Sequence, residues 1–144
     1  MRYHIDTHVH VYQCYEAENF LSRAVRNSEM AGSGANLVLC LTESSGFDFF
    51  HSLKDCVATN TLVAGWTISL IPEQPAVILK QADQSIIIIA GRQVISTQGL
   101  EVLALFTEQK FDDGQDTQAI INAINDKNGL AVLPWGVGKW LGKR

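Results

Sequence analysis

Apolar positions near the start of the chain change from strand-like to helix-like spacing and back. The segment Tyr3-His4-Ile5 predicts a short strand. From Ala17 onward, apolar residues recur at i, i+3, i+4, i+7 and i+8, which predicts a helix with one buried face. Gly32 and Gly34 can end that helix. The apolar run Asn36–Leu41 is typical of a strand that is covered on both faces, as in a parallel sheet.

A second helix is indicated by the segment Ser45-Gly46-Phe47-Asp48, which has the spacing of a capping box. Phe47, Phe50 and Leu53 follow at helical intervals. The resulting order of strand, helix, strand and helix is typical of a βα barrel or a layered α/β sheet.

The middle of the chain breaks this rhythm. Several strand-like runs are separated by turn-like groups, and we expect antiparallel hairpins there. The runs are Val63–Ile71, Ala76–Lys80, Ser85–Ile89, Gln93–Ser96 and Glu101–Leu105. Helical spacing returns at Ala119, Ile120, Ala123 and Ile124, with Asp116 as a candidate N-cap, Gly129 as a candidate stop and Leu130–Leu133 as a further strand. We therefore predict a single α/β domain over residues 1–144, a partial or distorted TIM-like barrel with a hairpin-rich middle.

Composition narrows the classes of protein and partner. Hydrophobic residues make up 47% and charged residues 18%, so the chain is globular rather than disordered. The net charge of −4 gives no reason to expect nucleic acid or an anionic membrane as a partner. The three cysteines lack CxxC spacing, and no signal peptide or membrane span is evident, so we expect reduced thiols in a cytoplasmic protein. The loop Gly136-Val137-Gly138-Lys139 lacks the spacing of a nucleotide-binding loop, and a tight turn is the preferred interpretation.

His8 and His10 are the sharpest chemical signal. Residues two apart on a strand point to the same side, so the two imidazoles can converge on one metal ion. By the same alternation, Asp6 falls on that side as a further ligand or as a group that orients a histidine. The alternative is an ordinary half-exposed strand.

The segment Asp6-Thr7-His8-Val9-His10 resembles the opening of the polymerase and histidinol phosphatase (PHP) family, and more distantly that of the amidohydrolases. Both families begin their barrels with a D-x-H-x-H loop that binds divalent metals. The stretch Gly91–Leu103 is similar to the PHP segment in which a glycine-glutamate motif precedes a ligand-bearing strand, and the helix and strand ending at Pro134 are similar to those before its His-Pro motif. The resemblance implies a phosphoesterase that uses one or two Zn, Mn or Fe ions and a small substrate, phosphorylated in such enzymes.

Five positions depart from the family pattern. Thr42-Glu43-Ser44 stands where the family has Thr-Asp-His, Gln93 replaces a metal-bridging glutamate, and Leu133 replaces the histidine before proline. Glu101 stands where a histidine is common and can still bind a metal. The family's last motifs would lie beyond Arg144, so either the chain is a piece of a longer barrel or its site has been altered.

Two hypotheses of function follow. In the first, His8, His10, Asp6 and Glu101 bind metal and Glu43 acts as a further ligand or as a general base on metal-activated water. The plain alternative for Glu43 is a charge at a helix start, which the helix dipole favours. In the second hypothesis, the domain is catalytically inactive and serves binding or assembly, and its open sheet edges predict a homodimer.

Overall fold

The first sheet has five strands, and its order differs from the order along the chain. The computed structural model describes residues 2–32, 34 and 36–135. The sheet runs β1-β2-β5-β4-β3, and β2 pairs in parallel with both β1 and β5. Its strands are β1 (Tyr3–Val9), β2 (Asn36–Leu41), β3 (Thr67–Leu70), β4 (Ala76–Gln81) and β5 (Gln84–Ile89). The interpretation of Asn36–Leu41 as a strand with parallel neighbours is therefore confirmed.

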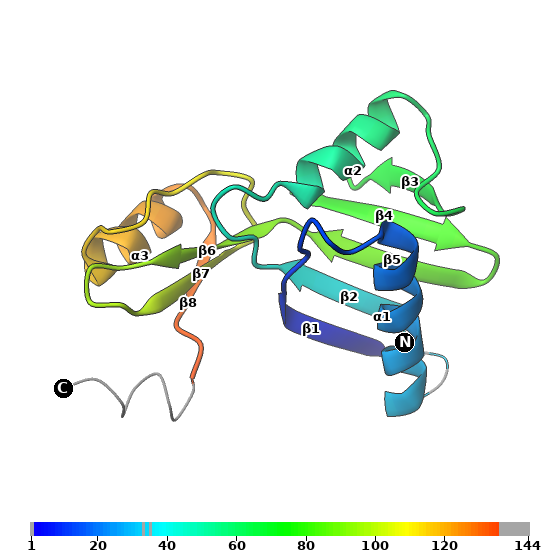
Figure 1. Ribbon diagram of the computed structural model, residues 1–144, viewed down its shortest axis with the longest axis horizontal. Helices are drawn as coiled ribbons and strands as arrows, with labels where there is room; N and C mark the ends of the chain where they lie inside the picture. Colours follow the sequence, from blue (N-terminus) through cyan, green and yellow to red (C-terminus); the bar gives the residue numbers. More distant parts are fainter. Residues whose placement is uncertain (1, 33, 35, 136–144) are drawn as a thin grey trace.

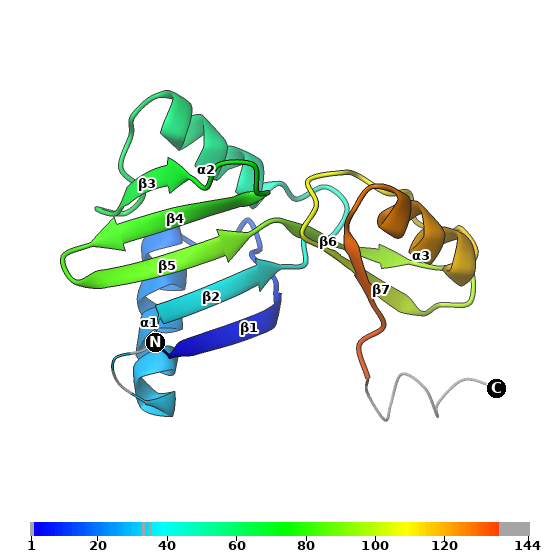
Figure 2. The ribbon, with the colours of Figure 1, turned by 180° about the vertical axis from the view of Figure 1, so that it is seen from behind.

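Two helices cover one face of this sheet (Figures 1 and 2). Helix α1 (Ala17–Ala31) connects β1 to β2, and α2 (Phe49–Ala58) connects β2 to β3. Their apolar residues pack on the sheet's alternate apolar positions in one core, whose most deeply buried members are Leu21, Leu41, Leu53, Val77, Leu79, Ile86 and Ile88. The helix predicted from Ala17 is confirmed, whereas the second helix begins at Phe49, after the predicted capping box, and its N-cap residue is Asp48.

The second sheet has three antiparallel strands in the order β6-β7-β8. These strands are β6 (Gly91–Ile95), β7 (Glu101–Leu105) and β8 (Leu130–Val132), and α3 (Thr117–Asp126) packs on one face of the sheet. The predicted N-cap of α3 is confirmed, because the Asp116 carboxylate accepts hydrogen bonds from the backbone N–H groups of Gln118 and Ala119.

The prediction of a TIM-like barrel is wrong. The described residues form two sheets of five and three strands with three short helices, and they close no barrel. A βα barrel needs a helix between successive parallel strands, but β3, β4 and β5 are joined directly as antiparallel hairpins, as are β6 and β7. The early strand-helix rhythm therefore extends only as far as α2.

A close backbone crossing joins the two sheets at Gly91. A Cβ atom at this position would overlap the carbonyl oxygen of Leu41 and would lie 2.8 Å from that of Ala104. Glu43, the second residue after β2, pairs with β6 there, since its N–H donates to the Gly91 carbonyl at 3.2 Å and its carbonyl accepts from Gln93 N–H at 3.0 Å. Only glycine allows three backbones to approach this closely.

None of the helices in the described part of the chain has the length and apolar character that a bilayer crossing requires.

The loop Gly136–Lys139 and the basic residues Lys139, Lys143 and Arg144 lie outside the described residues.

We predict that Gly91→Ala lowers the free energy of unfolding by about 3 kcal/mol, the upper end of the range for overpacking, because the added methyl group meets backbone atoms. Gly114→Ala is the control, since Gly114 has positive φ but open space around it, and its expected cost is about 1–2 kcal/mol. Urea unfolding followed by circular dichroism measures both. Equal costs for the two variants would contradict a tight crossing at Gly91.

Candidate metal centre

A β-bulge near the end of β1 determines where the histidines point. Thr7 and His8 together oppose the single residue Cys40 of β2, because Asp6 pairs with Leu39 and Val9 pairs with Leu41. A bulge of this kind re-aims the side chains that follow it. Val9 joins the core beneath α1 and α2, so His8 and His10, which alternate with Val9, project to the opposite face of the sheet.

Asp6 stabilises the bulge and does not lie with the histidines. Its Oδ1 accepts a hydrogen bond of 3.1 Å from the backbone N–H of His8. The side chain lines a cleft of about 700 Å³ between β1 and α1, on the helix-covered face. Sequence alternation predicted Asp6 on the same side as His8, and the extra residue in the bulge reverses that relation. The structure therefore does not bring Asp6 into a ligand cluster with His8 and His10.

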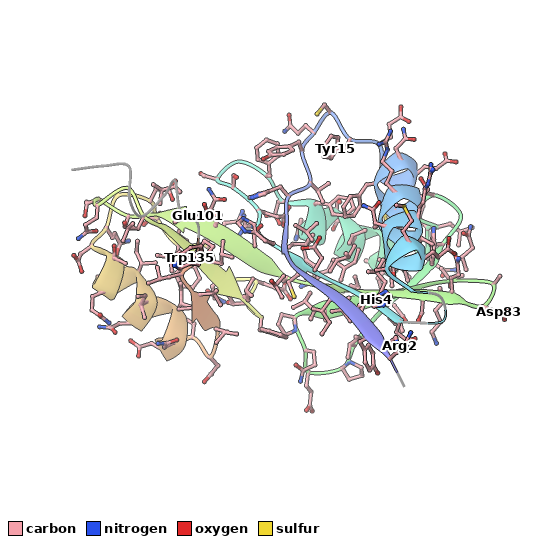
Figure 3. All side chains as sticks on the ribbon, turned by 90° about the horizontal axis from the view of Figure 1, so that it is seen from below. Arg2, His4, Tyr15, Asp83, Glu101 and Trp135 are labelled. Carbon is pink, nitrogen blue, oxygen red and sulfur yellow. The ribbon has the colours of Figure 1, made fainter. Side chains whose placement is uncertain are left out.

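Glu101, the first residue of β7, completes the cluster from the other sheet. Its Oε1 lies 3.0 Å from Nε2 of His8, and Nε2 of His8 lies 3.1 Å from Nε2 of His10. One ligand atom from each of the three residues lies within 4.8 Å of the other two. The Glu101 side chain is 8% exposed and that of His8 is 34% exposed, so the cluster is open to solvent on the histidine side. Figure 3 labels Glu101 on the three-stranded sheet, away from the β1 end marked by His4.

This donor set matches the requirements of a divalent transition metal. Two imidazoles and one carboxylate are a common ligand set of catalytic zinc sites, which keep a further position open. A zinc–nitrogen distance of roughly 2.0–2.1 Å in a tetrahedron places neighbouring ligand atoms about 3.3 Å apart. The two contacts of His8, at 3.0 and 3.1 Å, are close to that separation, and the ligand atoms of all three residues lie within 4.8 Å of one another.

Glu43 lies outside this cluster and is engaged elsewhere. It is 2% exposed, and its carboxylate accepts hydrogen bonds from the backbone N–H groups of Phe49 and, at 3.3 Å, Phe50. These are the first two residues of α2, whose N-cap residue Asp48 makes no side-chain capping bond. The arrangement matches the plain alternative of a helix-start charge. The structure does not bring Glu43 to the histidines as a ligand or a base.

A charged network surrounds Glu43 and fixes the loop before α2. Nη2 of Arg92, on β6, lies 3.1 Å from Oδ1 of Asp48, and Nζ of Lys110 lies 3.0 Å from its Oδ2. Arg92 also donates a hydrogen bond of 3.0 Å to the Phe47 carbonyl. Burial raises the pKa of Glu43 above its ordinary value, although the two backbone hydrogen bonds and Arg92 partly oppose this shift. This network could not be predicted from sequence, because its members Asp48, Arg92 and Lys110 are far apart in the chain.

The cysteines are free thiols and take no part in the cluster. Burial raises the pKa of the Cys40 thiol, and the charge of Asp6 raises it further, so this group stays protonated near neutral pH. His51 lies on the exposed side of α2, where its Nε2 is 3.8 Å from Oδ1 of Asp55.

Sequence reasoning missed the aromatic surroundings of the cluster. The ring of Tyr12 stacks on that of His10, with centroids 5.8 Å apart and an angle of 17° between the planes. The spacing His8-Val9-His10-Val11-Tyr12 contained the signal, since alternate residues share one side of an extended segment.

No protein family model, curated protein or solved structure matches this chain. The resemblance of Asp6–His10 to the PHP family therefore stays a prediction.

We predict that the free energy of unfolding of the wild type, relative to that of Glu43→Gln, decreases as pH rises above about 4.5, the ordinary pKa of a glutamate. A carboxyl with a raised folded-state pKa binds its proton more tightly when folded, so it stabilises the fold at low pH, and this contribution is lost as pH rises through the folded pKa. Glutamine cannot titrate in this range. Urea unfolding of both proteins measures the trend between roughly pH 4 and 8, a range that includes the titration of a carboxyl with a raised pKa. A difference that grows with pH would indicate a lowered pKa instead.

Proposed function

We propose that this protein is a metal-dependent hydrolase that uses His8, His10 and Glu101 to hold a divalent cation, with zinc, manganese or iron as candidates. The convergence of these three side chains from two different sheets is the observation that supports the proposal. Asp6 contributes by holding the bulge that directs His8, so it acts as a positioning residue.

The proposed reaction is hydrolysis of a phosphoester of a small molecule. A divalent cation supplies positive charge that activates water and offsets the negative charge of a phosphoryl group. The choice of a phosphoester follows the resemblance of the D-x-H-x-H segment to the PHP family. Glu101 is nearly buried and His8 is partly exposed, so a substrate would approach from the histidine side.

The free thiols of Cys14, Cys40 and Cys56 agree with a reducing compartment, and we infer a cytoplasmic location on that ground. The net charge of −4 supports a small-molecule substrate over nucleic acid.

We predict that the purified wild type binds a divalent metal and that His8→Ala, His10→Ala and Glu101→Gln each weaken binding by at least about tenfold, the lower end for loss of a group that supports a metal site. Mass spectrometric metal analysis and titration calorimetry with Zn²⁺ and Mn²⁺ measure the effect. Phosphoesterase activity toward a general aryl phosphate should disappear in the same variants.

His51→Ala is the matched control, because His51 is an exposed histidine whose partner Asp55 lies on the same helix. Its metal content and activity should equal those of the wild type. Unchanged metal binding in His8→Ala, or equal losses in His51→Ala, would exclude the proposed site.

A second candidate function is assembly through the edge of the five-stranded sheet. β1 is the terminal strand of that sheet, and its residue Ile5 is 60% exposed. Edge strands with exposed apolar residues are templates for pairing with another chain. This observation favours a homodimer joined through β1.

We predict a dimeric mass for the wild type by light scattering and a monomeric mass for Ile5→Lys, because a charge on an edge strand opposes pairing. Leu62→Lys is the control, since Leu62 is similarly exposed but lies outside the strands. A monomeric wild type across a concentration series would rule out this assembly.

A further inference from the structure

A row of aromatic rings extends from the candidate metal centre. The ring centroids of His8 and His10 are 5.0 Å apart, and Tyr12 stacks on the far side of the pair, 5.8 Å from His10. Tyr15 and Phe47 then meet Tyr12 edge-on, at 5.7 and 5.8 Å. The row is therefore in direct ring contact with one of the proposed metal ligands.

Of these rings, Tyr12, Tyr15 and Phe47 border a pocket of about 260 Å³ between two chain segments. One loop follows β1 and the other follows β2, so the pocket lies at the carboxyl ends of two parallel strands, where binding sites of α/β sheets form. The volume is below the roughly 300–1,000 Å³ of a site for a complete drug-sized ligand, so it accommodates one ring or a similar group. The lining residues are Val11, Tyr12, Gln13 and Tyr15 from the first loop, Gly46, Phe47 and Asp48 from the second, and Phe49 at the start of α2.

The exposure of the two tyrosines distinguishes them from core aromatics. Tyr12 is 41% exposed and Tyr15 is 51% exposed. By contrast, the edge-on pair of Phe20 and Phe49 packs against the core beneath α1 and α2. Aromatic surface that serves only packing is normally covered, whereas tyrosines with one open side are common at binding sites.

The electrostatics of the pocket favour a neutral ring over a cation. Aromatic rings beside a carboxylate can bind quaternary ammonium groups. Here the carboxylate is that of Asp48, and it already lies 3.1 Å from the Arg92 guanidinium and 3.0 Å from the Lys110 ammonium. The charge of Asp48 is therefore balanced by its two basic neighbours.

We propose that Tyr12, Tyr15 and Phe47 form a subsite for a planar aromatic group of the substrate, so that the protein prefers aromatic phosphoesters to aliphatic ones. This inference rests on the proposed function, because the scissile phosphate would lie at the His8, His10 and Glu101 cluster. The aromatic group would stack against Tyr12 or Tyr15 in the pocket beside it.

The test compares two non-hydrolysable probes, phenylphosphonate and methylphosphonate, by titration calorimetry on the Zn²⁺-loaded protein. In the wild type, burial of the larger apolar area already favours the aromatic probe over the methyl probe. Stacking on one aromatic ring should tighten binding of the aromatic probe by about a further two- to tenfold. Tyr12→Ala and Tyr15→Ala should reduce that preference at unchanged metal content, and Tyr12→Phe should keep it because stacking does not need the hydroxyl group. Tyr3→Ala removes an exposed tyrosine elsewhere and should have no effect.

Equal binding of the two probes, or a preference that survives in both alanine variants, would overturn the subsite. Tighter binding of phosphocholine than of phenylphosphonate would also overturn it, because it would indicate a cation site.

A metal-free arm separates the two proposals. Benzyl alcohol and cyclohexylmethanol are titrated into the metal-free protein while the ring resonances of Tyr12 and Tyr15 are followed by nuclear magnetic resonance. Selective shifts with benzyl alcohol support the subsite even if no metal binds, in which case only the hydrolase proposal fails. Equal responses to both alcohols overturn the subsite whatever the metal result.

Discussion

The backbone crossing at Gly91 is the constraint on which the rest of the structure depends. Three main chains meet there, and a side chain at this position would overlap the Leu41 carbonyl oxygen. The contact lets β6 pair with Glu43 beyond the end of β2 and so redirects the chain from the first sheet into the second. Because β6 aligns β7, the crossing also carries Glu101 to within 3.0 Å of His8. The candidate metal centre is thus a consequence of how two sheets are joined.

The bulge in β1 has an equally local cause and an equally distant effect. One additional residue, held by the Asp6 carboxylate on the His8 N–H, turns His8 and His10 away from the helix-covered face. A regular strand would have placed both histidines beside Asp6 and beneath α1. The aspartate of the D-x-H-x-H segment therefore matters here through the backbone.

The sequence predicted elements better than their arrangement. The periodicity from Ala17 and the run Asn36–Leu41 were sufficient for α1 and β2, because each depends on local spacing. Two glutamates show the limit: both Glu43 and Glu101 are candidates for the site from sequence, but Glu43 caps α2 and only Glu101 lies beside His8. The barrel prediction failed for the same reason, since an early strand-helix rhythm does not determine which strands later pair.

The ligand geometry is held by apolar packing as well as by the ligands themselves. Leu103 and Leu105, which alternate with Glu101 on β7, pack with Val38 and Cys40 on the uncovered face of the first sheet. These contacts fix β7 against the sheet independently of any cation, so the three ligand side chains are already close together. A cation that binds here would therefore lose little binding free energy to ordering of the chain. Small metal-dependent folds differ, because they fold only when the metal binds. The histidine side of the cluster stays open to solvent, and the proposed substrate would approach from there.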